Sequence, residues 1–381
     1  MQAVQTPIIP IVADLIQQHP GTISLGQGVV SYPPPPEAIA QITTFLSQPN
    51  NHKYQSVQGI PPLLAAIAEK LQQENAIALG ADRDVVVTAG SNMGFLNAVL
   101  AITSPGDEII LQTPYYFNHE MAIAIAGCRA VCVPTDENYQ LQLDQIAAAI
   151  TDRTRAIVTI SPNNPTGVVY SEASLRAVNA LCGNRGLYHI HDEAYEYFTY
   201  DGIVPFSPGS LPGNHTISLF SLSKAYGFAS WRIGYMVIPQ ELLLPVMKIQ
   251  DTNVICPAVV SQYAALGALQ AGVDYCRHRL GAIAAMRQLM LTELEQIADI
   301  CTVPPTQGAF YFLLRLQGDW DAFALVKRLI QDYGVAVIPG TTFGLTTGCY
   351  LRVAFGALQK VTAAEGIDRL ITGLRQIHSS R

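Results

Sequence analysis

The sequence predicts an α/β fold built around a mostly parallel sheet that helices cover on both faces. Three observations support this prediction. Short β-branched or apolar runs alternate with helical segments at the spacing of βαβ units. Turn residues such as Gly90 and Pro105 separate these runs. The chain has 381 residues, of which 49% are hydrophobic and 13% charged, so it carries enough apolar material for a large buried core.

The alternation is clearest in the first half of the chain. A β-branched run at residues 85–88 leads through Gly90 into a helix predicted over 92–102. Ser171 is a candidate N-cap for a later helix. Ligands of such sheets bind at the carboxyl ends of the strands, so we expect the chemistry there. The other strands are predicted at 108–112, 130–133, 155–160, 187–191 and 216–220, and the other helices at 117–126, 143–150 and 171–182.

Beyond about residue 240 the pattern changes to that of a smaller α/β unit. The proline run at 33–36 favours an extended segment near the other end of the chain. The length of the chain suggests two domains. In the second unit, helices are predicted at 240–250, 258–271, 273–297, 320–333 and 362–377, and strands at 310–316, 335–338 and 350–353.

Composition and charge argue against several classes of partner. The formal net charge is −7 and Lys and Arg form no run, so neither nucleic acid nor an acidic membrane surface is expected as a partner. No apolar stretch reaches the roughly 18 residues that a membrane helix needs, and residues 1–28 lack a signal-peptide pattern. We therefore expect a cytoplasmic protein. The seven Cys residues form no CxxC pair, which argues against a metal site or a disulfide framework.

A lysine beside two hydroxyls follows the last predicted strand of the first unit. Lys224 lies in the segment Ser-Leu-Ser-Lys-Ala-Tyr-Gly at 221–227, and Arg232 follows in Trp-Arg-Ile-Gly. A lysine amine forms imines with aldehydes when its charged form is disfavoured. A guanidinium is a fixed cation suited to phosphate. Taken alone, Lys224 could equally be a surface residue of a polar loop.

Other polar residues follow neighbouring predicted strands. Asp192 ends one strand, and Tyr195 comes three residues later. A carboxylate at this place can hold a protonated pyridine nitrogen, and a phenol can reach the same ligand. Asn164 lies in the turn at 161–167, where an Asn-Pro pair by itself indicates only a turn.

A candidate phosphate site opens the helix predicted at 92–102. Gly90, Ser91 and Asn92 lie where free backbone N–H groups and the helix dipole bind anions. The alternative is that Ser91 or Asn92 is simply the N-cap of the helix. Tyr115 and Tyr116 add an aromatic plate after the next strand. An amine, an acid, a phenol, an amide and phosphate donors together match the needs of pyridoxal 5'-phosphate.

These segments resemble the class I/II aminotransferases of the fold-type I pyridoxal-phosphate superfamily. The resemblance runs from Leu25 to Arg352, and its specific elements are the SxSK…R segment, DEAY at 192–195 and NNPTG at 163–167. It implies an enzyme that moves an amino group from an L-amino acid to a 2-oxo acid. It also implies a large domain of residues 46–275 with a seven-stranded sheet, and a small α/β domain of residues 1–45 and 276–381.

The resemblance implies a role for each matched residue. Lys224 holds the cofactor as an imine and later moves the proton between the substrate Cα and the cofactor carbon. Asp192 pairs with the pyridinium nitrogen. Tyr195 and Asn164 hold the phenolic oxygen of the ring. Tyr116 stacks on the face of the ring.

The remaining matched residues are expected to bind phosphate and substrate. Tyr54 is expected to reach the phosphate of the neighbouring subunit's cofactor, which implies a homodimer with shared active sites. Arg352 is expected to bind the substrate α-carboxylate, next to Gly28 and Asn164. Phosphate contacts are implied for Gly90, Ser91, Asn92, Ser221, Ser223 and Arg232.

One segment departs from the pattern of the family. Relatives often carry Pro-Asp after the glycine near Gly28, whereas residues 29–32 are Val-Val-Ser-Tyr here. Substrate specificity therefore cannot be carried over from relatives. We find no second Arg for a dicarboxylate substrate. The aromatic residues Tyr32, Tyr115, Tyr116 and Phe343 favour aromatic, methionine-like or kynurenine-like amino acids over aspartate, although such residues also pack cores.

Two other functions share the cofactor. A C–S lyase or a cyclopropane-forming synthase would use the same first steps and then expel a group from the substrate side chain. A non-catalytic regulator that binds pyridoxal phosphate would carry a basic DNA-binding domain, and this acidic chain contains no segment resembling one.

Overall fold

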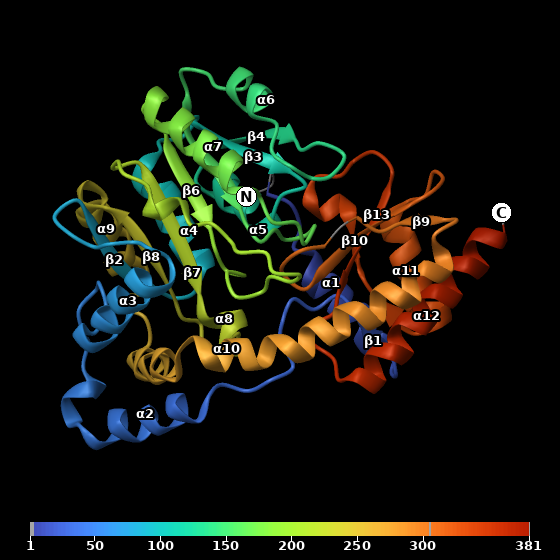
Figure 1. The fold of residues 1–381 in the computed structure, drawn as a ribbon, viewed down its shortest axis with the longest axis horizontal. Coiled ribbons are helices and arrows are strands. Elements are labelled where there is room, and N and C mark those ends of the chain that lie inside the picture. Colours follow the sequence, from blue (N-terminus) through green and yellow to red (C-terminus); the bar gives the residue numbers. More distant parts are fainter. Residues whose placement is uncertain (1–3, 305, 381) are drawn as a thin grey trace.

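A seven-stranded sheet forms the centre of the computed structural model, which describes residues 4–304 and 306–380 (Figure 1). The strand order is β2-β8-β7-β6-β5-β3-β4. Only β8 runs antiparallel to its neighbours, so the predicted mostly parallel sheet is confirmed. The strands are β2 (Arg83–Thr88), β3 (Glu108–Thr113), β4 (Arg129–Pro134), β5 (Thr154–Ile160), β6 (Tyr188–Asp192), β7 (Thr216–Ser221) and β8 (Gly234–Pro239).

The strand β8 is the one that the sequence pattern misses. The six predicted runs correspond to β2 to β7, whereas β8 begins two residues after Arg232 and was not predicted. Every residue of β8 is buried, and its sequence Gly-Tyr-Met-Val-Ile-Pro shows no alternation of polar and apolar residues. A continuous short apolar run does not by itself distinguish a buried strand from a helix.

Helices cover both faces of this sheet, as predicted. On one face, apolar side chains of α4, α5 and α9 form a common core with the strands. On the other face, α3 and α10 cover one half and α6 and α7 the other. Ser171 is confirmed as the N-cap of α7, because its hydroxyl accepts a hydrogen bond from the N–H of Ser174. These helices are α3 (Pro61–Glu74), α4 (Ser91–Ile102), α5 (Phe117–Ile125), α6 (Leu143–Ala148), α7 (Glu172–Arg185) and α9 (Leu243–Asn253), and α8 (Leu222–Ala225) follows β7.

A long helix joins the sheet to the C-terminal unit (Figure 1). This helix, α10 (Val259–Leu294), is interrupted at Gly272, where φ is 70° and ψ is −171°. The sequence predicts two helices that meet at this residue. Glycine is the residue that adopts a positive φ at no steric cost, so the break coincides with the residue that permits it.

The C-terminal unit contains an antiparallel sheet with the order β12-β13-β10-β9. The N-terminal strand β1 (Ile23–Ser24) pairs in parallel with β11 (Val335–Ala336), which joins the N-terminal segment to the C-terminal unit. The domain boundaries given above stay a prediction. The other elements are α1 (Ile8–Gln18), α2 (Pro36–Ser47), β9 (Cys301–Thr302), β10 (Tyr311–Leu316), α11 (Ala322–Tyr333), β12 (Ile338–Pro339), β13 (Cys349–Ala354) and α12 (Lys360–Ser379).

Within residues 4–304 and 306–380, no helix combines the length and the apolar character needed to cross a membrane. The same residues contain no cluster of three or more side chains arranged to hold a metal ion.

Candidate active site

A cavity of about 140 Å³ lies at the carboxyl ends of the central strands. Ile160, Asp192 and Ser221 line it, and each is the last residue of its strand. Parallel strands end at the same edge of a sheet, so residues far apart in the sequence meet there. The structure brings ten of the predicted site residues to this cavity, namely Ser91, Asn92, Tyr116, Asn164, Asp192, Tyr195, Ser221, Ser223, Lys224 and Arg232.

Lys224 reaches the cavity from α8, the short helix that follows β7. The hydroxyl of Ser221 caps this helix by accepting a hydrogen bond from the N–H of Ser223. The amine of Lys224 donates to the carbonyl oxygen of Gly28, at 2.5 Å. Burial, together with the nearby Arg352 and Arg232, lowers the pKa of Lys224 to about 8. Roughly a tenth of the amine is therefore neutral at pH 7, far more than for an ordinary lysine, and the neutral amine is the form that attacks a carbonyl.

Asp192 has a buried partner that the sequence did not indicate. Nε2 of His119 lies 3.1 Å from Oδ2 of Asp192, although the angle does not meet hydrogen-bond geometry. The ring of His119 stacks on Phe95 with ring centroids 3.9 Å apart. The other carboxylate oxygen of Asp192 accepts a hydrogen bond from the N–H of Ala194. A histidine three residues after Tyr116, in the first turn of a predicted helix, is the only sequence signal for this contact.

A second unpredicted residue, Tyr311, lies against Tyr195. Their hydroxyl oxygens are 2.7 Å apart, and Asn164 also approaches the Tyr195 hydroxyl, at 3.4 Å. Burial, and then the neighbouring Tyr311, raises the pKa of Tyr195 well above its ordinary value. The phenol of Tyr195 therefore stays protonated and can donate a hydrogen bond to a ligand. Tyr311 lies in β10 of the other unit, and no local motif marks it.

Asn164 contributes to the site and not only to a turn. Its side-chain oxygen accepts a hydrogen bond from Nη1 of Arg352, at 2.9 Å. The neighbouring Asn163 is the residue that stabilises the turn, because its side-chain oxygen accepts hydrogen bonds from the N–H and the hydroxyl of Thr166. A turn function is thus fulfilled by Asn163, which leaves Asn164 directed at the cavity.

Arg352 is a buried cation with an unused donor. The residue is 2% exposed, and its Nη2 donates to the carbonyl oxygen of Gly26 at 2.8 Å. Nε has no hydrogen-bond partner among the described residues. The rings of Tyr311 and Phe343 flank the guanidinium, with centroids 4.5 and 5.1 Å from its carbon. A buried guanidinium without a carboxylate partner is costly, so this arrangement fits an anionic ligand.

Gly28 lies beside Tyr311, which flanks the Arg352 guanidinium, and it does not line the 140 Å³ cavity. A Cβ at position 28 would lie 2.5 Å from the hydroxyl of Tyr311. No side chain fits there unless the tyrosine moves.

The start of α4 offers free donors to an anion. The N-cap position is Gly90, with a φ of 83°, and no side chain caps the helix. The alternative that Ser91 or Asn92 is the N-cap is therefore wrong. A Cβ at Gly90 would lie within contact of the Arg232 guanidinium, so only glycine fits beside this cation. Nη1 of Arg232 donates to the carbonyl oxygen of Ala229 at 2.8 Å.

Tyr54 is the one predicted site residue that lies away from both the cavity and the Arg352 guanidinium. It is 81% exposed, in the segment that precedes α3. Its expected role lies in a neighbouring subunit's site, and the homodimer stays a prediction.

The chemistry of this site fits pyridoxal phosphate. Three cations, Lys224, Arg232 and Arg352, face one carboxylate, Asp192, so the site has an excess of positive charge for a phosphate and a carboxylate. The free N–H groups at the start of α4 add phosphate donors. The fold and the site together define an enzyme that uses a phosphorylated pyridine aldehyde.

Comparisons with known proteins indicate the same class of enzyme. Residues 20–370 match the model of the family "Aminotransferase class I and II". The chain is 31% identical over 380 residues to aromatic aminotransferase ISS1 of Arabidopsis thaliana, covering 97% of this chain and 94% of that protein. It is 34% identical over 357 residues to a probable aspartate/prephenate aminotransferase of Aquifex aeolicus, covering 90% and 88%.

Solved structures of aminotransferases share the whole fold. A mutant of Thermus thermophilus aspartate aminotransferase superposes with a TM-score of 0.90 at 29% identity, covering 98% of both chains. The aromatic aminotransferase of Pyrococcus horikoshii superposes with a TM-score of 0.88 at 28% identity, covering 96% of this chain and 99% of that one. The chain belongs to the class I and II aminotransferases, and it is a pyridoxal-phosphate-dependent aminotransferase.

Proposed function

We propose that this aminotransferase takes its amino group from an L-amino acid with an apolar or aromatic side chain and passes it to a 2-oxo acid. The buried, unpaired guanidinium of Arg352 carries this proposal, because it fits one carboxylate through two parallel hydrogen bonds. Among the described residues that line the cavity, Lys224 and Arg232 are the only cations, and neither is free for a second substrate carboxylate under this proposal. Phe343, which is fully buried beside Arg352, supports an apolar side-chain site.

Pyridoxal phosphate, when bound, supplies an aldehyde that forms an imine with an amine, and a protonated ring that draws electrons from the substrate Cα. Lys224 is the amine that holds it under this proposal. As a neutral amine, Nζ of Lys224 would also take the proton from the substrate Cα. An ordinary lysine is almost fully protonated near neutral pH and therefore cannot accept this proton. The lowered pKa of about 8 leaves part of the Lys224 amine neutral and able to accept it.

The residues around Lys224 hold the ring in place under this proposal. Asp192 accepts the hydrogen bond of the ring N–H, and His119 keeps that carboxylate in position from behind. Tyr195 and Asn164 bind the phenolic oxygen, and Tyr116 packs on the ring face. Tyr195 suits this role because its raised pKa keeps the hydroxyl proton available.

The phosphate and the substrate carboxylate occupy opposite ends of the site in this scheme. The phosphate binds Arg232 and the start of α4, where Gly90 leaves room for the guanidinium. Arg352 binds the substrate carboxylate, and Gly28 keeps space for it. Tyr54 completes the phosphate site of a second subunit in a cytoplasmic homodimer. The other phosphate donors in this scheme are Ser91, Asn92, Ser221 and Ser223.

A panel of amino donors with one 2-oxo acid tests the proposal. Phenylalanine, tyrosine, methionine and kynurenine are each mixed with the holoenzyme, and aspartate is the comparison donor. We expect the cofactor absorbance to change to that of the amine form, and an apolar donor to give at least a tenfold higher kcat/KM than aspartate. Preference for aspartate would contradict the proposed substrate class. Ammonia release without 2-oxo acid turnover would indicate a lyase instead.

A further inference from the structure

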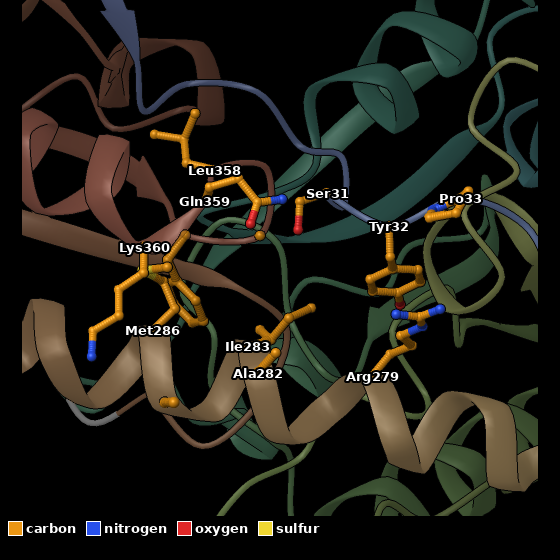
Figure 2. Close-up of a pocket in the computed structure, with 13 residues that line it drawn as sticks. Ser31, Tyr32, Pro33, Arg279, Ala282, Ile283, Met286, Leu358, Gln359 and Lys360 are labelled. Carbon is orange, nitrogen blue, oxygen red and sulfur yellow. The ribbon is translucent and has the colours of Figure 1, made fainter.

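A second cavity lies between the N-terminal segment, α10 and the loop before α12 (Figure 2). Its volume is about 460 Å³, against about 140 Å³ for the active-site cavity. This size falls in the range of small-molecule sites. The cavity is not part of the site described above. Its lining residues include Ser31, Tyr32, Arg279, Ile283, Met286 and Leu358.

The lining combines an apolar wall with a cation. Ile283, Met286 and Leu358 supply the wall, and Figure 2 shows Arg279 beside the ring of Tyr32 at one end. Lys360 adds a second cation near the other end. The described lining residues include no Asp or Glu. An anion is therefore favoured, and an ammonium group would find no carboxylate here.

Arg279 is held in place but keeps an unused donor. Its guanidinium carbon lies 5.6 Å from the ring centroid of Tyr32 and 5.1 Å from that of Tyr275. Nε is buried and has no hydrogen-bond partner among the described residues. The unused Nε–H of this planar guanidinium is suited to a carboxylate oxygen.

The cavity is connected to the catalytic lysine. The hydroxyl of Tyr32 donates to the backbone oxygens of Lys224 and Ala225, at 3.0 and 3.2 Å. Gly28, whose carbonyl oxygen accepts from the Lys224 amine, precedes Tyr32 on the same segment. On the opposite side, the lining residue Phe355 follows Arg352 closely in the chain. A molecule in the cavity would thus contact the segments that carry Gly28 and Arg352.

We propose that this cavity binds an apolar carboxylic acid that lacks an ammonium group, the class to which apolar 2-oxo acids belong. The carboxylate pairs with Arg279, and the apolar body packs on Ile283, Met286 and Leu358. Binding is transmitted to Lys224 through Tyr32. The binding site stands on its own observations, whereas its effect on turnover rests on the function proposed above.

Calorimetric titration of the holoenzyme with 2-naphthoate tests the binding site, because this acid has neither an amino nor an oxo group. Arg279→Gln should weaken one class of 2-naphthoate sites about tenfold or more, since a charge-assisted hydrogen bond is lost. Ala282→Trp, which fills the cavity from an exposed position, should remove the same class. Arg277→Gln is the matched control, because this exposed arginine of α10 does not line the cavity. If neither cavity variant alters any class of sites, the proposal is wrong.

The connection to Lys224 has a separate readout. 2-Naphthoate should shift the pH midpoint of the cofactor absorbance in the parent enzyme, and Arg279→Gln should remove the part of the shift that binding in this cavity causes, while any part caused by binding at Arg352 stays. Tyr32→Phe should keep the binding and show the same reduced shift, because it removes the hydrogen bonds to Lys224 and Ala225. The full parent shift in Tyr32→Phe would refute this connection. Failure of every amino donor, with 2-naphthoate binding intact, would refute only the proposed function.

Discussion

Gly28 and Tyr311 form a pair whose replacement should reveal a strong coupling. A Cβ at position 28 would lie 2.5 Å from the Tyr311 hydroxyl, whereas the next ring atom of Tyr311 would be 3.5 Å away. Gly28→Ala should therefore displace the phenol, and Gly28→Ala with Tyr311→Phe should remove the clash. Overpacking typically costs about 1–3 kcal/mol, which corresponds to roughly fivefold to 150-fold in kcat/KM if the displacement is expressed in catalysis.

Tyr311→Phe alone should have a smaller effect. It removes the 2.7 Å hydrogen bond to Tyr195, worth about 1 kcal/mol, which corresponds to roughly fivefold in kcat/KM. The double variant should resemble Tyr311→Phe, because alanine then meets only ordinary contacts. The assay is kcat/KM of the four proteins with one donor and one 2-oxo acid, together with their cofactor content. If the two effects multiply in the double variant, the steric explanation of Gly28 is refuted.

Three further predictions concern charge. The pKa of Lys224, lowered to about 8 by burial and then by Arg352 and Arg232, means that the unfolded chain holds this proton more tightly. The free energy of unfolding of the cofactor-free protein should therefore rise between about pH 8 and 10 more steeply than that of Lys224→Met. Thermal unfolding at several pH values measures this difference. If stability depends on pH in the same way in both proteins, the lowered pKa of Lys224 is contradicted. Burial and then Glu196 raise the pKa of Glu193 to about 8. Between about pH 4.5 and 8 the folded protein keeps this proton and the unfolded chain loses it, so the free energy of unfolding should fall as the pH rises. Glu193→Gln, which can keep the hydrogen bond from Ser207, should flatten that decline, and an unchanged slope would count against it. Arg352→Lys should raise KM for the amino donor by about tenfold to hundredfold at unchanged cofactor content, and an unchanged KM would exclude Arg352 as the carboxylate site.

The site shows which kinds of residue the sequence could predict. Lys224, Asp192 and Asn164 each follow a strand that local pattern alone predicts, and strand ends of a parallel sheet must meet at one edge. Their positions around one cavity follow from that rule. The roles assigned to them remain predictions for the experiments above. His119 and Tyr311 were not predicted, because their contacts depend on how a helix and a distant strand pack against the sheet.

Short β-branched or apolar runs, together with the turn residues between them, predicted most of the helices and strands, since those preferences act over a few residues. The strand β8, a fully buried apolar run, was not predicted, and neither were the helices α1, α2 and α3. The tertiary structure decided which distant residues are in contact. It placed Tyr311 against Gly28, left a donor of Arg352 unused, and formed the cavity between Tyr32 and α10. These contacts join residues hundreds of positions apart, and only the packing of the whole chain brings such residues together.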